Sequence, residues 1–332
     1  MKNRSQKTLV ALTMGDPSGI STEITLKSWK SRKIRSPFFV IHDPNYINKM
    51  IKKMGLRMKI KTINHPKESF KYYKKYLPVF PIEINSETEL GKPDKRNTKN
   101  ILKSINKAVD FVKNGEASSV VTNPVSKDII NKVQKNFRGH TEYLAMKDKQ
   151  KIFCMMMINS KLKVVPLTTH LPLKRVSQAI SQKLILKTVI LINNTLKNDF
   201  GVKKPKIVVT GLNPHSGDKG VIGLEEKKII TPAIRKCKNK KINVVGPISA
   251  DSAFIEKNLK QYDAFLCMYH DQALIAAKII DFENTVNYTA GLSFVRTSPD
   301  HGTGYDIAKK FIANESSLIS AINTAILISK NR

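Results

Sequence analysis

The sequence lacks the marks of a secreted or membrane-spanning protein. It has three cysteines in 332 residues, and no two of them form a CxxC pair. Two lie within apolar runs, which is typical of buried reduced thiols in a reducing cytoplasm. No apolar run approaches the roughly 20 residues that a membrane span needs, and the apolar stretch at 9–14 is too short for a signal-peptide core. We therefore expect a cytoplasmic protein.

Acidic residues are scarce beside basic ones, with 26 Asp+Glu against 58 Lys+Arg and a formal net charge of +32. Such a charge would suit a nucleic-acid-binding protein, which is the non-enzymatic alternative. The lysines, however, are scattered over nearly every polar segment instead of forming a basic block. No RNP-type aromatic motif is present either. We therefore expect no nucleic-acid partner and attribute the charge to a lysine-rich composition.

The two common glycine-rich nucleotide motifs are also missing. No GxGxxG follows a predicted strand, and no Gly-Lys-Ser/Thr follows the turn Gly15-Asp16-Pro17-Ser18-Gly19. That turn lies between a predicted strand at 8–14 and a helix at 21–29. Its free backbone amides would suit an anion, although an ordinary strand-to-helix turn explains the sequence equally well.

Short apolar runs alternate with segments of helical periodicity along most of the chain. This order predicts a mainly parallel sheet covered by helices on both faces. With 41% hydrophobic residues, 332 residues suffice for a large core divided into two lobes. Further strands are predicted at 37–41, 58–63, 79–84, 119–122, 152–158, 162–169, 206–210, 242–248 and 264–269. Further helices are predicted at 45–54, 97–113, 173–197, 225–237 and 316–328, with Thr141 as the N-cap of another.

Three histidines each follow one of these apolar runs. His170 follows 162–169, His215 follows 206–210 after a short Gly-Leu-Asn-Pro segment, and His270 follows 264–269. In open α/β sheets, ligands bind outside the carboxyl ends of the strands. Neutral imidazole is the commonest protein ligand for zinc-like ions, and three ligands leave a coordination position open for a substrate. The sequence therefore predicts a metal site formed by His170, His215 and His270.

Eight motifs in order along the chain resemble one family, the PdxA family of 4-hydroxythreonine-4-phosphate dehydrogenases in vitamin B6 biosynthesis. They are MGDPSGI at 14–20, NPVSK at 123–127, GHTEYLA at 139–145, TTHLPL at 168–173, GLNPHSG at 211–217, GPISAD at 246–251, MYHDQ at 268–272 and RTSPDHGT at 296–303.

The resemblance implies an NAD-dependent oxidation of 4-phosphooxy-L-threonine, with NADP as a possible cofactor. The resulting β-keto acid would lose carbon dioxide to give 3-amino-2-oxopropyl phosphate. It also implies a two-lobed α/β/α fold like that of isocitrate and isopropylmalate dehydrogenases, and a homodimer whose active site is shared between subunits. On the expected division of the chain, residues 1–125 with 275–332 form one lobe and residues 126–274 the other.

The resemblance assigns the three histidines to a divalent ion, either zinc, magnesium or cobalt, with His170 from one subunit and the other two from its partner. Two further sets of residues follow from it. Substrate contacts fall on His140, Thr141, Lys278, Asn287 and Arg296. The loop from Asp300 to Ala308 resembles the adenosine-contacting loop of β-decarboxylating dehydrogenases, with Gly302, Thr303 and Asp306 as cofactor residues.

The proton acceptor that the oxidation needs has two candidates, Asp251 and Asp271. Asp271 directly follows a proposed metal ligand, so it would equally serve to orient the imidazole. A loop-capping aspartate is the simpler interpretation of either residue. The remaining histidines at 42 and 65 are interpreted as ordinary core or loop residues, and His301 as a residue that fixes the cofactor loop.

Some positions depart from the family pattern. The family usually continues the last loop as Ala-Gly-Lys-Gly, whereas this chain has Ala308-Lys309-Lys310-Phe311. Gly304 replaces a usual alanine, Ala273 a usual glycine and Ala290 a usual leucine. No proposed ligand is lost. Because glycine lets a backbone approach a cofactor closely, we expect weaker NAD binding in this chain.

Two alternatives to the predicted reaction remain. A paralogous dehydrogenase acting on threonate or erythronate 4-phosphate would keep the metal and most of the substrate residues. A degenerate binding module would keep the fold without metal-dependent turnover.

Overall fold

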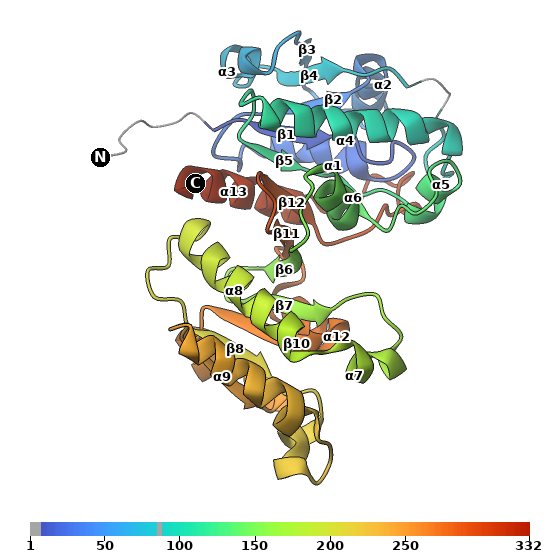
Figure 1. The fold of residues 1–332 in the computed structure, drawn as a ribbon. Coiled ribbons are helices and arrows are strands. Elements are labelled where there is room, and N and C mark those ends of the chain that lie inside the picture. The colour runs from blue at the N-terminus through green and yellow to red at the C-terminus, as the bar shows by residue number, and fades with distance from the viewer. Residues whose placement is uncertain (1–7, 85–87) are drawn as a thin grey trace. The chain divides into compact units, whose positions relative to one another are not determined.

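The structure is a computed structural model that describes residues 8–84 and 88–332. The basic N-terminal segment at 1–7 lies outside the described residues. The chain forms two compact units. Unit 1 contains the described residues up to Asp148 together with Ser293–Lys330, and unit 2 contains Lys149–Leu292 with Asn331–Arg332. Each unit is built from strands and helices in alternation, as Figure 1 shows.

Unit 1 has six strands in the spatial order β3-β4-β2-β1-β5-β12, and every neighbouring pair is parallel. The strands are β1 (Val10–Thr13), β2 (Phe38–His42), β3 (Ile60–Thr62), β4 (Leu77–Pro81), β5 (Ser119–Val121) and β12 (Val295–Pro299). Every residue of β1, β2 and β12 is buried. Parallel strands that are buried throughout have both faces covered, as the apolar runs predicted.

The main helices of unit 1 are amphipathic segments that follow these strands. They are α1 (Ser21–Lys30), α2 (Pro44–Lys53), α3 (Ser69–Tyr72), α4 (Thr98–Lys113), α5 (Lys127–Asn131), α6 (His140–Lys147) and α13 (Ser316–Asn331). Their starts follow from local chemistry. Asp43, for example, caps α2 by accepting hydrogen bonds from the backbone N–H groups of Asn45 (2.7 Å) and Tyr46 (3.1 Å), and Pro44 occupies the first turn.

Unit 2 has its own six strands in the order β11-β6-β7-β10-β8-β9. They are β6 (Cys154–Ile158), β7 (Lys163–Thr168), β8 (Ile207–Thr210), β9 (Val244–Ile248), β10 (Ala264–Tyr269) and β11 (Val286–Ala290). The pairs β7–β10, β10–β8 and β8–β9 are parallel, while β6 runs antiparallel to both β7 and β11. The mainly parallel sheet of the predicted α/β class is therefore confirmed, with one antiparallel insertion.

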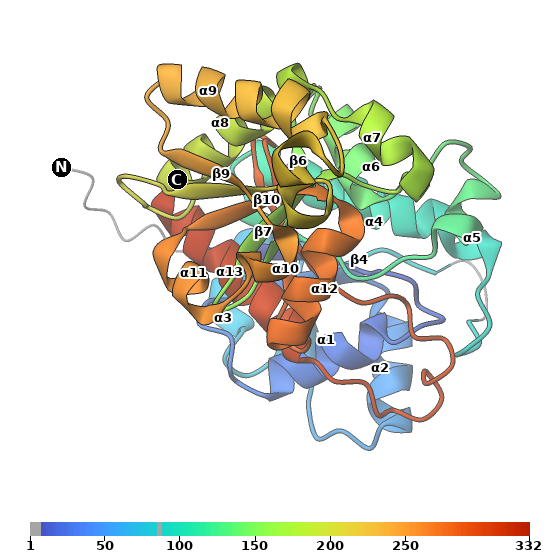
Figure 2. The same cartoon turned by 90° about the horizontal axis from the view of Figure 1, so that it is seen from below.

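The helices of unit 2 cover both sides of its strands. They are α7 (Val176–Ala179), α8 (Gln182–Asn198), α9 (Thr231–Asn239), α10 (Ala250–Ala253), α11 (Glu256–Gln261) and α12 (His270–Asp281). Figure 2 shows α8 and α9 on one side of the strands and α10, α11 and α12 on the other. Successive side chains of β10 point to opposite faces of the sheet. On one face, Phe265 and Cys267 pack with Ala273 and Ala277 of α12 in one apolar cluster.

Several sequence predictions of helices need correction. The helix predicted at 173–197 is three pieces, a 3₁₀ turn at Leu173–Arg175 followed by α7 and α8. It breaks because Ser181 adopts an extended backbone and its hydroxyl accepts a hydrogen bond from the N–H of Leu184 at 3.2 Å, which starts α8 afresh. Thr141 is not an N-cap. The helix α6 already contains it, and Gly139 with φ 144° is the cap.

The boundaries of the units also differ from the expected division at 125/126 and 274/275. Residues up to Asp148 belong to unit 1, where Tyr143 of α6 donates a hydrogen bond to Asn106 of α4 at 2.8 Å. The segment 275–292 belongs to unit 2 because α12 packs on β7 and β10, and because β11 pairs with β6. Neither α12, β11 nor β12 was among the predicted elements.

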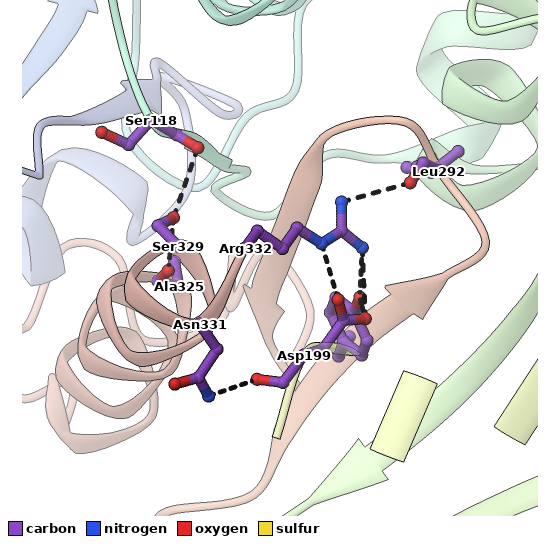
Figure 3. A network of polar contacts seen from close by, with 8 residues as sticks. Ser118, Asp199, Leu292, Ala325, Ser329, Asn331 and Arg332 are labelled. Carbon is purple, nitrogen blue, oxygen red and sulfur yellow. Dashed lines mark hydrogen bonds and ion pairs between the residues drawn. The ribbon is translucent and has the colours of Figure 1, made fainter. Parts of the chain in front are cut away.

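The last two residues of the chain close a polar network in unit 2 (Figure 3). The guanidinium of Arg332 donates to both carboxylate oxygens of Asp199, at 2.6 and 3.1 Å, to the hydroxyl of Tyr288 at 3.0 Å and to the carbonyl of Leu292 at 3.3 Å. Asn331 adds a bond to the carbonyl of Asp199 at 2.7 Å. The side chain of Asp199 is only 4% exposed, so its hydrogen bonds come from these protein groups.

Candidate active site

Four adjacent parallel strands of unit 2 end at one edge, and the predicted catalytic and metal-binding residues follow them. In the order β7-β10-β8-β9, His170 follows β7, His270 opens α12 after β10, His215 lies in the loop after β8, and Asp251 lies in α10 after β9. The carboxyl ends of parallel strands are where α/β proteins bind ligands. The topology therefore brings residues that are up to 100 positions apart in the sequence to the same edge.

The rings of His170 and His270 lie side by side, with centroids 5.9 Å apart and an angle of 43° between their planes. This proximity follows from the pairing of β7 with β10, in which Thr168 is opposite Tyr269. Because zinc–nitrogen bonds are about 2.0–2.1 Å long, two imidazoles on one ion have centroids roughly 5–6 Å apart. The observed spacing fits two ligands of one ion. The division of these two histidines between subunits, which the resemblance implied, is not needed to bring them together.

The imidazole of His270 is oriented by its neighbour. The Nδ1 atom of His270 lies 2.7 Å from the Oδ1 atom of Asp271. A carboxylate at this distance holds the proton on Nδ1 and leaves Nε2 as the electron-pair donor. Of the two roles left open for Asp271 by the sequence, this geometry favours the orienting one.

His215 lies in an unusual loop. Five consecutive residues from His215 to Lys219 have positive φ angles, between 41° and 79°, and only one of them is glycine. His170 also has a positive φ, of 54°. Such backbone costs roughly 1–2 kcal/mol for each non-glycine residue, and it gathers at functional sites. In the part of the chain that the structure describes, no three His, Cys, Asp or Glu side chains are grouped closely enough to hold an ion. The expected site draws on two subunits, so the participation of His215 stays a prediction.

Asp251 lies in the first turn of α10 and is exposed. Hydrogen bonds from Ser249 and from the backbone of Ser252, together with the nearby His215, lower the pKa of its carboxyl group against a smaller opposing effect of burial. The carboxylate is therefore ionised at neutral pH and able to accept a proton. With Asp271 it lines a pocket of about 400 Å³ whose other walls are mostly apolar side chains of α10 and α12.

Two predicted substrate residues of unit 2 lie on α12 and β11. Lys278 is seven residues beyond Asp271, so both project from the same face of α12, and its Nζ atom is 5.3 Å from the ring of Phe282. Asn287 lies in β11 opposite Met157. Its side-chain oxygen is buried and has no hydrogen-bond partner in the structure. A buried amide oxygen without a partner is costly unless a ligand supplies a donor.

The other predicted substrate residues gather in unit 1 around a buried guanidinium. Arg296 in β12 is only 2% exposed. It donates to the hydroxyl of Thr122 from Nη2 at 2.6 Å and from Nε at 3.2 Å, and to the hydroxyl of Thr141 from Nη1 at 3.5 Å. Burial lowers the pKa of Arg296 to about 9, with Glu142 opposing the shift. The structure thus brings Arg296 and Thr141 together.

His140 completes this cluster. Burial, followed by the positive charges of Arg296 and Lys127, lowers the pKa of His140 well below its ordinary value, so the imidazole is neutral at pH 7. The residue as a whole is half-buried, but its Nε2 atom is buried and has no hydrogen-bond partner in the described part of the chain. A buried guanidinium beside an imidazole nitrogen and a threonine hydroxyl is suited to an anionic, hydrogen-bonding ligand.

The predicted cofactor loop packs on the turn Gly15–Gly19, also in unit 1. The N–H of Ile20 donates to the carbonyl of Thr303 at 2.9 Å, and a Cβ on Gly19 would lie 2.3 Å from that same oxygen. Tyr305 donates to Asp16 at 2.6 Å, and burial raises the pKa of Asp16, with Tyr305 and Ser18 opposing. The close approach explains the glycine of the turn, which the sequence alone left as an ordinary strand-to-helix connection.

The substituted end of this loop keeps the backbone that glycine prefers. Phe311, at a position where the family has glycine, has φ 55°. Its carbonyl and that of Ala313 accept hydrogen bonds from Lys27 at 3.0 and 2.8 Å. Lys309, at the other lost glycine, pairs with Glu89 at 2.9 Å. Gly302 and Asp306 are exposed on the same loop.

Comparison with known proteins identifies the family. The sequence profile described as pyridoxal phosphate biosynthetic protein PdxA matches residues 33–325. The chain belongs to this family. The resemblance read from the motifs is thereby confirmed, as is the expected role in pyridoxal phosphate biosynthesis.

Named relatives agree with this assignment along almost the whole chain. A 4-hydroxythreonine-4-phosphate dehydrogenase of Methylorubrum populi is 39% identical over 325 residues, covering 95% of this chain and 93% of the relative. One from Sulfurihydrogenibium sp. is 40% identical over 324 residues, covering 97% and 99%. The crystal structure of a 4-hydroxythreonine-4-phosphate dehydrogenase from Klebsiella pneumoniae superposes with a TM-score of 0.87 at 30% identity, covering 97% of this chain and 99% of that one.

Three residues that tie the edge of unit 2 together were missed by the sequence analysis. Gln272 accepts hydrogen bonds from the N–H of Met268 and the hydroxyl of Thr210, and it donates to the carbonyl of Gly211 at 3.0 Å. It thus links the end of β10 with the loop after β8. The others, Glu225 and Glu226, hold the loop that carries His215. No periodicity marks such contacts, because most of their partners lie 12 or more residues away in other elements.

Proposed function

We propose that this member of the PdxA family oxidises 4-phosphooxy-L-threonine with NAD and decarboxylates the product to 3-amino-2-oxopropyl phosphate. The observation that carries the proposal is the juxtaposition of His170 and His270, with Asp271 orienting His270, at the carboxyl edge of four parallel strands. Relatives that cover almost the whole chain bear the name of this activity.

A divalent ion is proposed as the resident cofactor of this edge, held by His170, His270 and, from the loop after β8, His215. Imidazole ligands suit zinc or cobalt better than magnesium, which prefers oxygen. An ion bound there supplies Lewis acidity, which lowers the pKa of a coordinated hydroxyl and stabilises negative charge on oxygen during decarboxylation.

The residues of this chain would bind and orient the substrate and accept its proton. Arg296 and Thr141 bind an anionic group of the substrate in unit 1, and His140, being neutral, offers its Nε2 atom for a hydrogen bond. In unit 2, Lys278 offers positive charge and Asn287 an amide oxygen that has no hydrogen-bond partner among the described residues. We propose that both sets serve the same reaction.

The proton acceptor is proposed to be Asp251. Its carboxylate is exposed and lines the pocket at this edge, whereas Asp271 is engaged with His270. In the oxidation, Asp251 would accept the proton of the substrate hydroxyl, and NAD, when bound, would supply the acceptor for the hydride of the same carbon. The carbon–carbon bond to the carboxylate then breaks. Carbon dioxide leaves, and the electron pair that remains is later protonated.

NAD is proposed to bind at the loop that carries Gly302, Thr303 and Asp306. The exposed carboxylate of Asp306 would accept a hydrogen bond from a ribose hydroxyl. It would repel the extra phosphate of NADP, as acidic residues do at other dinucleotide sites. We therefore propose NAD rather than NADP as the preferred cofactor.

A homodimer is proposed because α12 exposes a large apolar face. Ile275 is 58% exposed, Ile279 80% and Phe282 65%. With Asp271 and Lys278, these residues occupy one side of the helix at spacings of three and four. A partner packed on this side would cover the edge that holds His270, so the active site would be shared between subunits.

No helix among the described residues is long and apolar enough to cross a membrane. A cytoplasmic location stays a prediction.

The proposed function is tested by following NADH production from 4-phosphooxy-L-threonine. We expect turnover that a chelator abolishes and that added zinc or cobalt restores. His270→Ala should lose the metal and nearly all activity, while His65→Ala, an exposed histidine of unit 1, keeps both. Activity on threonate or erythronate 4-phosphate alone would favour the paralogous dehydrogenase. A metal-free His270→Ala variant with full activity would refute the proposed mechanism.

A further inference from the structure

The loop that carries His215 is built around one buried carboxylate. Glu226 is 5% exposed, and its Oε1 atom accepts hydrogen bonds from the backbone N–H groups of Leu212 and Asn213, both at 2.8 Å. Its Oε2 atom accepts a third from the side-chain amide of Asn213 at 2.9 Å. The root of the loop, two residues before His215, is therefore held by three bonds to a single side chain.

The glycines of the loop show how closely it surrounds this carboxylate. A Cβ on Gly217 would lie 2.5 Å from Oε2 of Glu226, and Gly217 has φ 79°. A Cβ on Gly223 would lie 2.3 Å from the amide nitrogen of Asn213. Both distances are below 3.0 Å, so a side chain at either glycine would displace Glu226 or Asn213 from the hydrogen bonds described above. The left-handed stretch from His215 to Lys219 therefore depends on glycines that admit Glu226 and Asn213.

The preceding residue joins this loop to the segment that follows His170. Glu225 accepts a hydrogen bond from the amide of Asn213 at 2.8 Å and another from the hydroxyl of Ser177 at 2.6 Å. Ser177 lies in α7, seven residues after His170. The hydrogen bond from Ser177 contributes most to lowering the pKa of Glu225, and the bond from Asn213 lowers it further. Glu225 and Glu226 stand at the start of a π-helical turn, Glu226–Ile230, a rare conformation that often occurs at functional sites.

We propose that Glu226, assisted by Glu225, is a positioning residue for metal binding that fixes the His215 loop before the ion arrives. The proposal rests on the metal site of the proposed function. Glu226 is turned toward the loop backbone and would act through His215, without contacting the ion. Metal binding loses less conformational entropy when the backbone that carries the ligands is already fixed. Residues that orient ligands commonly change metal affinity about 10–100-fold when replaced.

The test compares cobalt affinity and loop protection in five forms of the full-length protein. They are the wild type, Glu226→Ala, Glu226→Gln, His215→Ala and the control Glu256→Ala. Glu256 is a carboxylate of the same unit whose ion pair, to Lys260 at 2.7 Å, lies on the exposed helix α11. Cobalt binding is measured by calorimetry. Hydrogen exchange of the backbone amides at 211–221 is measured on the metal-free protein, where no activity is involved.

We expect Glu226→Ala to bind cobalt about 10–100-fold more weakly than wild type and to exchange the amides of Leu212 and Asn213 faster. Glu226→Gln should lose less, because one oxygen still accepts from both amides, and Glu256→Ala should match wild type in both measurements. Should Glu226→Ala not fold, the expected result is a loss of several-fold in Glu226→Gln.

Two results overturn the inference and are distinguishable. If the wild type binds cobalt, His215→Ala does not, and the Glu226 variants retain wild-type affinity, the positioning role is wrong while the metal site stands. If the wild type and His215→Ala bind cobalt equally, or neither binds it, the proposed metal site fails and the role of Glu226 toward it fails with it.

Discussion

The seven histidines of the chain differ in what surrounds each imidazole. His170 and His270 lie ring beside ring at the end of two paired strands, while His140 is neutral beside a buried guanidinium. His65 caps a 3₁₀ turn in unit 1, and His301 contacts the carbonyl of Gly302. The sequence could predict which histidines follow strands. It left open whether Asp271 would turn toward His270, because adjacent residues in a chain need not face each other.

His42 is a core residue whose protonation state affects stability. It is 1% exposed. The N–H of Asp43 donates to its Nδ1 atom at 2.7 Å, which leaves the proton on Nε2, 3.0 Å from the hydroxyl of Thr22. Burial lowers the pKa of His42 from 6.5 to about 4, with Asp43 opposing. Between pH 6.5 and about 4, the imidazole of His42 is protonated in the unfolded chain but neutral in the folded protein.

The expected result is therefore a stability contribution from His42 that is fully present above pH 6.5 and is lost as the pH falls toward 4. The loss is about 3 kcal/mol, from 1.36 kcal/mol per pKa unit. Urea unfolding at several pH values, compared between wild type and His42→Gln, isolates this part from the carboxylates. Parallel curves for the two proteins between pH 6.5 and 4 would contradict the assignment.

Arg332 is predicted to stabilise unit 2 through Asp199. Arg332→Ala would leave a carboxylate that is 4% exposed without its guanidinium partner. Removing one partner of a buried pair costs about 3 kcal/mol or more, so a clear fall in the free energy of unfolding is expected. Denaturant unfolding followed by far-ultraviolet circular dichroism measures this free energy. Lys330→Ala, on the exposed side of α13, is the control. Equal stability of the Arg332 variant and wild type would show that water replaces the pairing.

At the scale of elements, apolar runs indicated most of the buried strands but missed β11 and β12. The strand predicted at 264–269 coincides with β10, and those at 119–122 and 37–41 differ from β5 and β2 by a residue or two. Helix breaks were less predictable. Ser181 interrupts a continuous apolar pattern at a single position. The run of positive φ angles at His215 gave no periodic signal, since its conformation is imposed by Glu226 from another element.

The altered end of the cofactor loop makes a prediction about NAD. Phe311 already has the backbone that glycine favours, so restoring glycine should not change the path of the loop. It would remove the side chain and let the backbone approach the cofactor. We expect Lys309→Gly with Phe311→Gly to lower the KM for NAD about tenfold, equivalent to roughly 1.4 kcal/mol.

The control for this loop is Lys309→Ala, which removes the ion pair with Glu89 without adding glycine freedom. It should change the KM for NAD less than the double variant does. Steady-state kinetics at saturating substrate give both values, and an unchanged KM in the double variant would refute the expected weakening.

At the scale of the whole molecule, the alternation of strands and helices predicted the α/β class. It did not give the unit boundaries at Asp148 and Leu292. The unit boundaries depend on which strand each segment pairs with, as β11 pairs with β6. Local periodicity does not predict pairings between segments that are distant in the sequence. The candidate residues likewise fall into two sets, with Arg296, Thr141 and His140 in unit 1 and the three histidines of the metal edge in unit 2. Only the family motifs related these two sets to one reaction.

The proposed dimer is tested on its most exposed apolar residue. Ile279→Glu places a charge on the α12 face without touching a proposed ligand, and we expect a monomer of reduced activity in light scattering and kinetic assays. Leu327→Glu is a matched control, since Leu327 is 54% exposed on α13 in unit 1. Were Ile279→Glu to remain dimeric and fully active, the interface would have to lie elsewhere.

The contact between Gly217 and Glu226 also constrains how this loop can evolve. Alanine at position 217 would meet the carboxylate at 2.5 Å, and a shortened residue at 226 would remove only this contact. The φ of 79° and the carbonyl oxygen of Gly223, 3.0 Å from the Cβ position, would still oppose the alanine. We therefore expect relatives to keep glycine at this position even where the glutamate has changed.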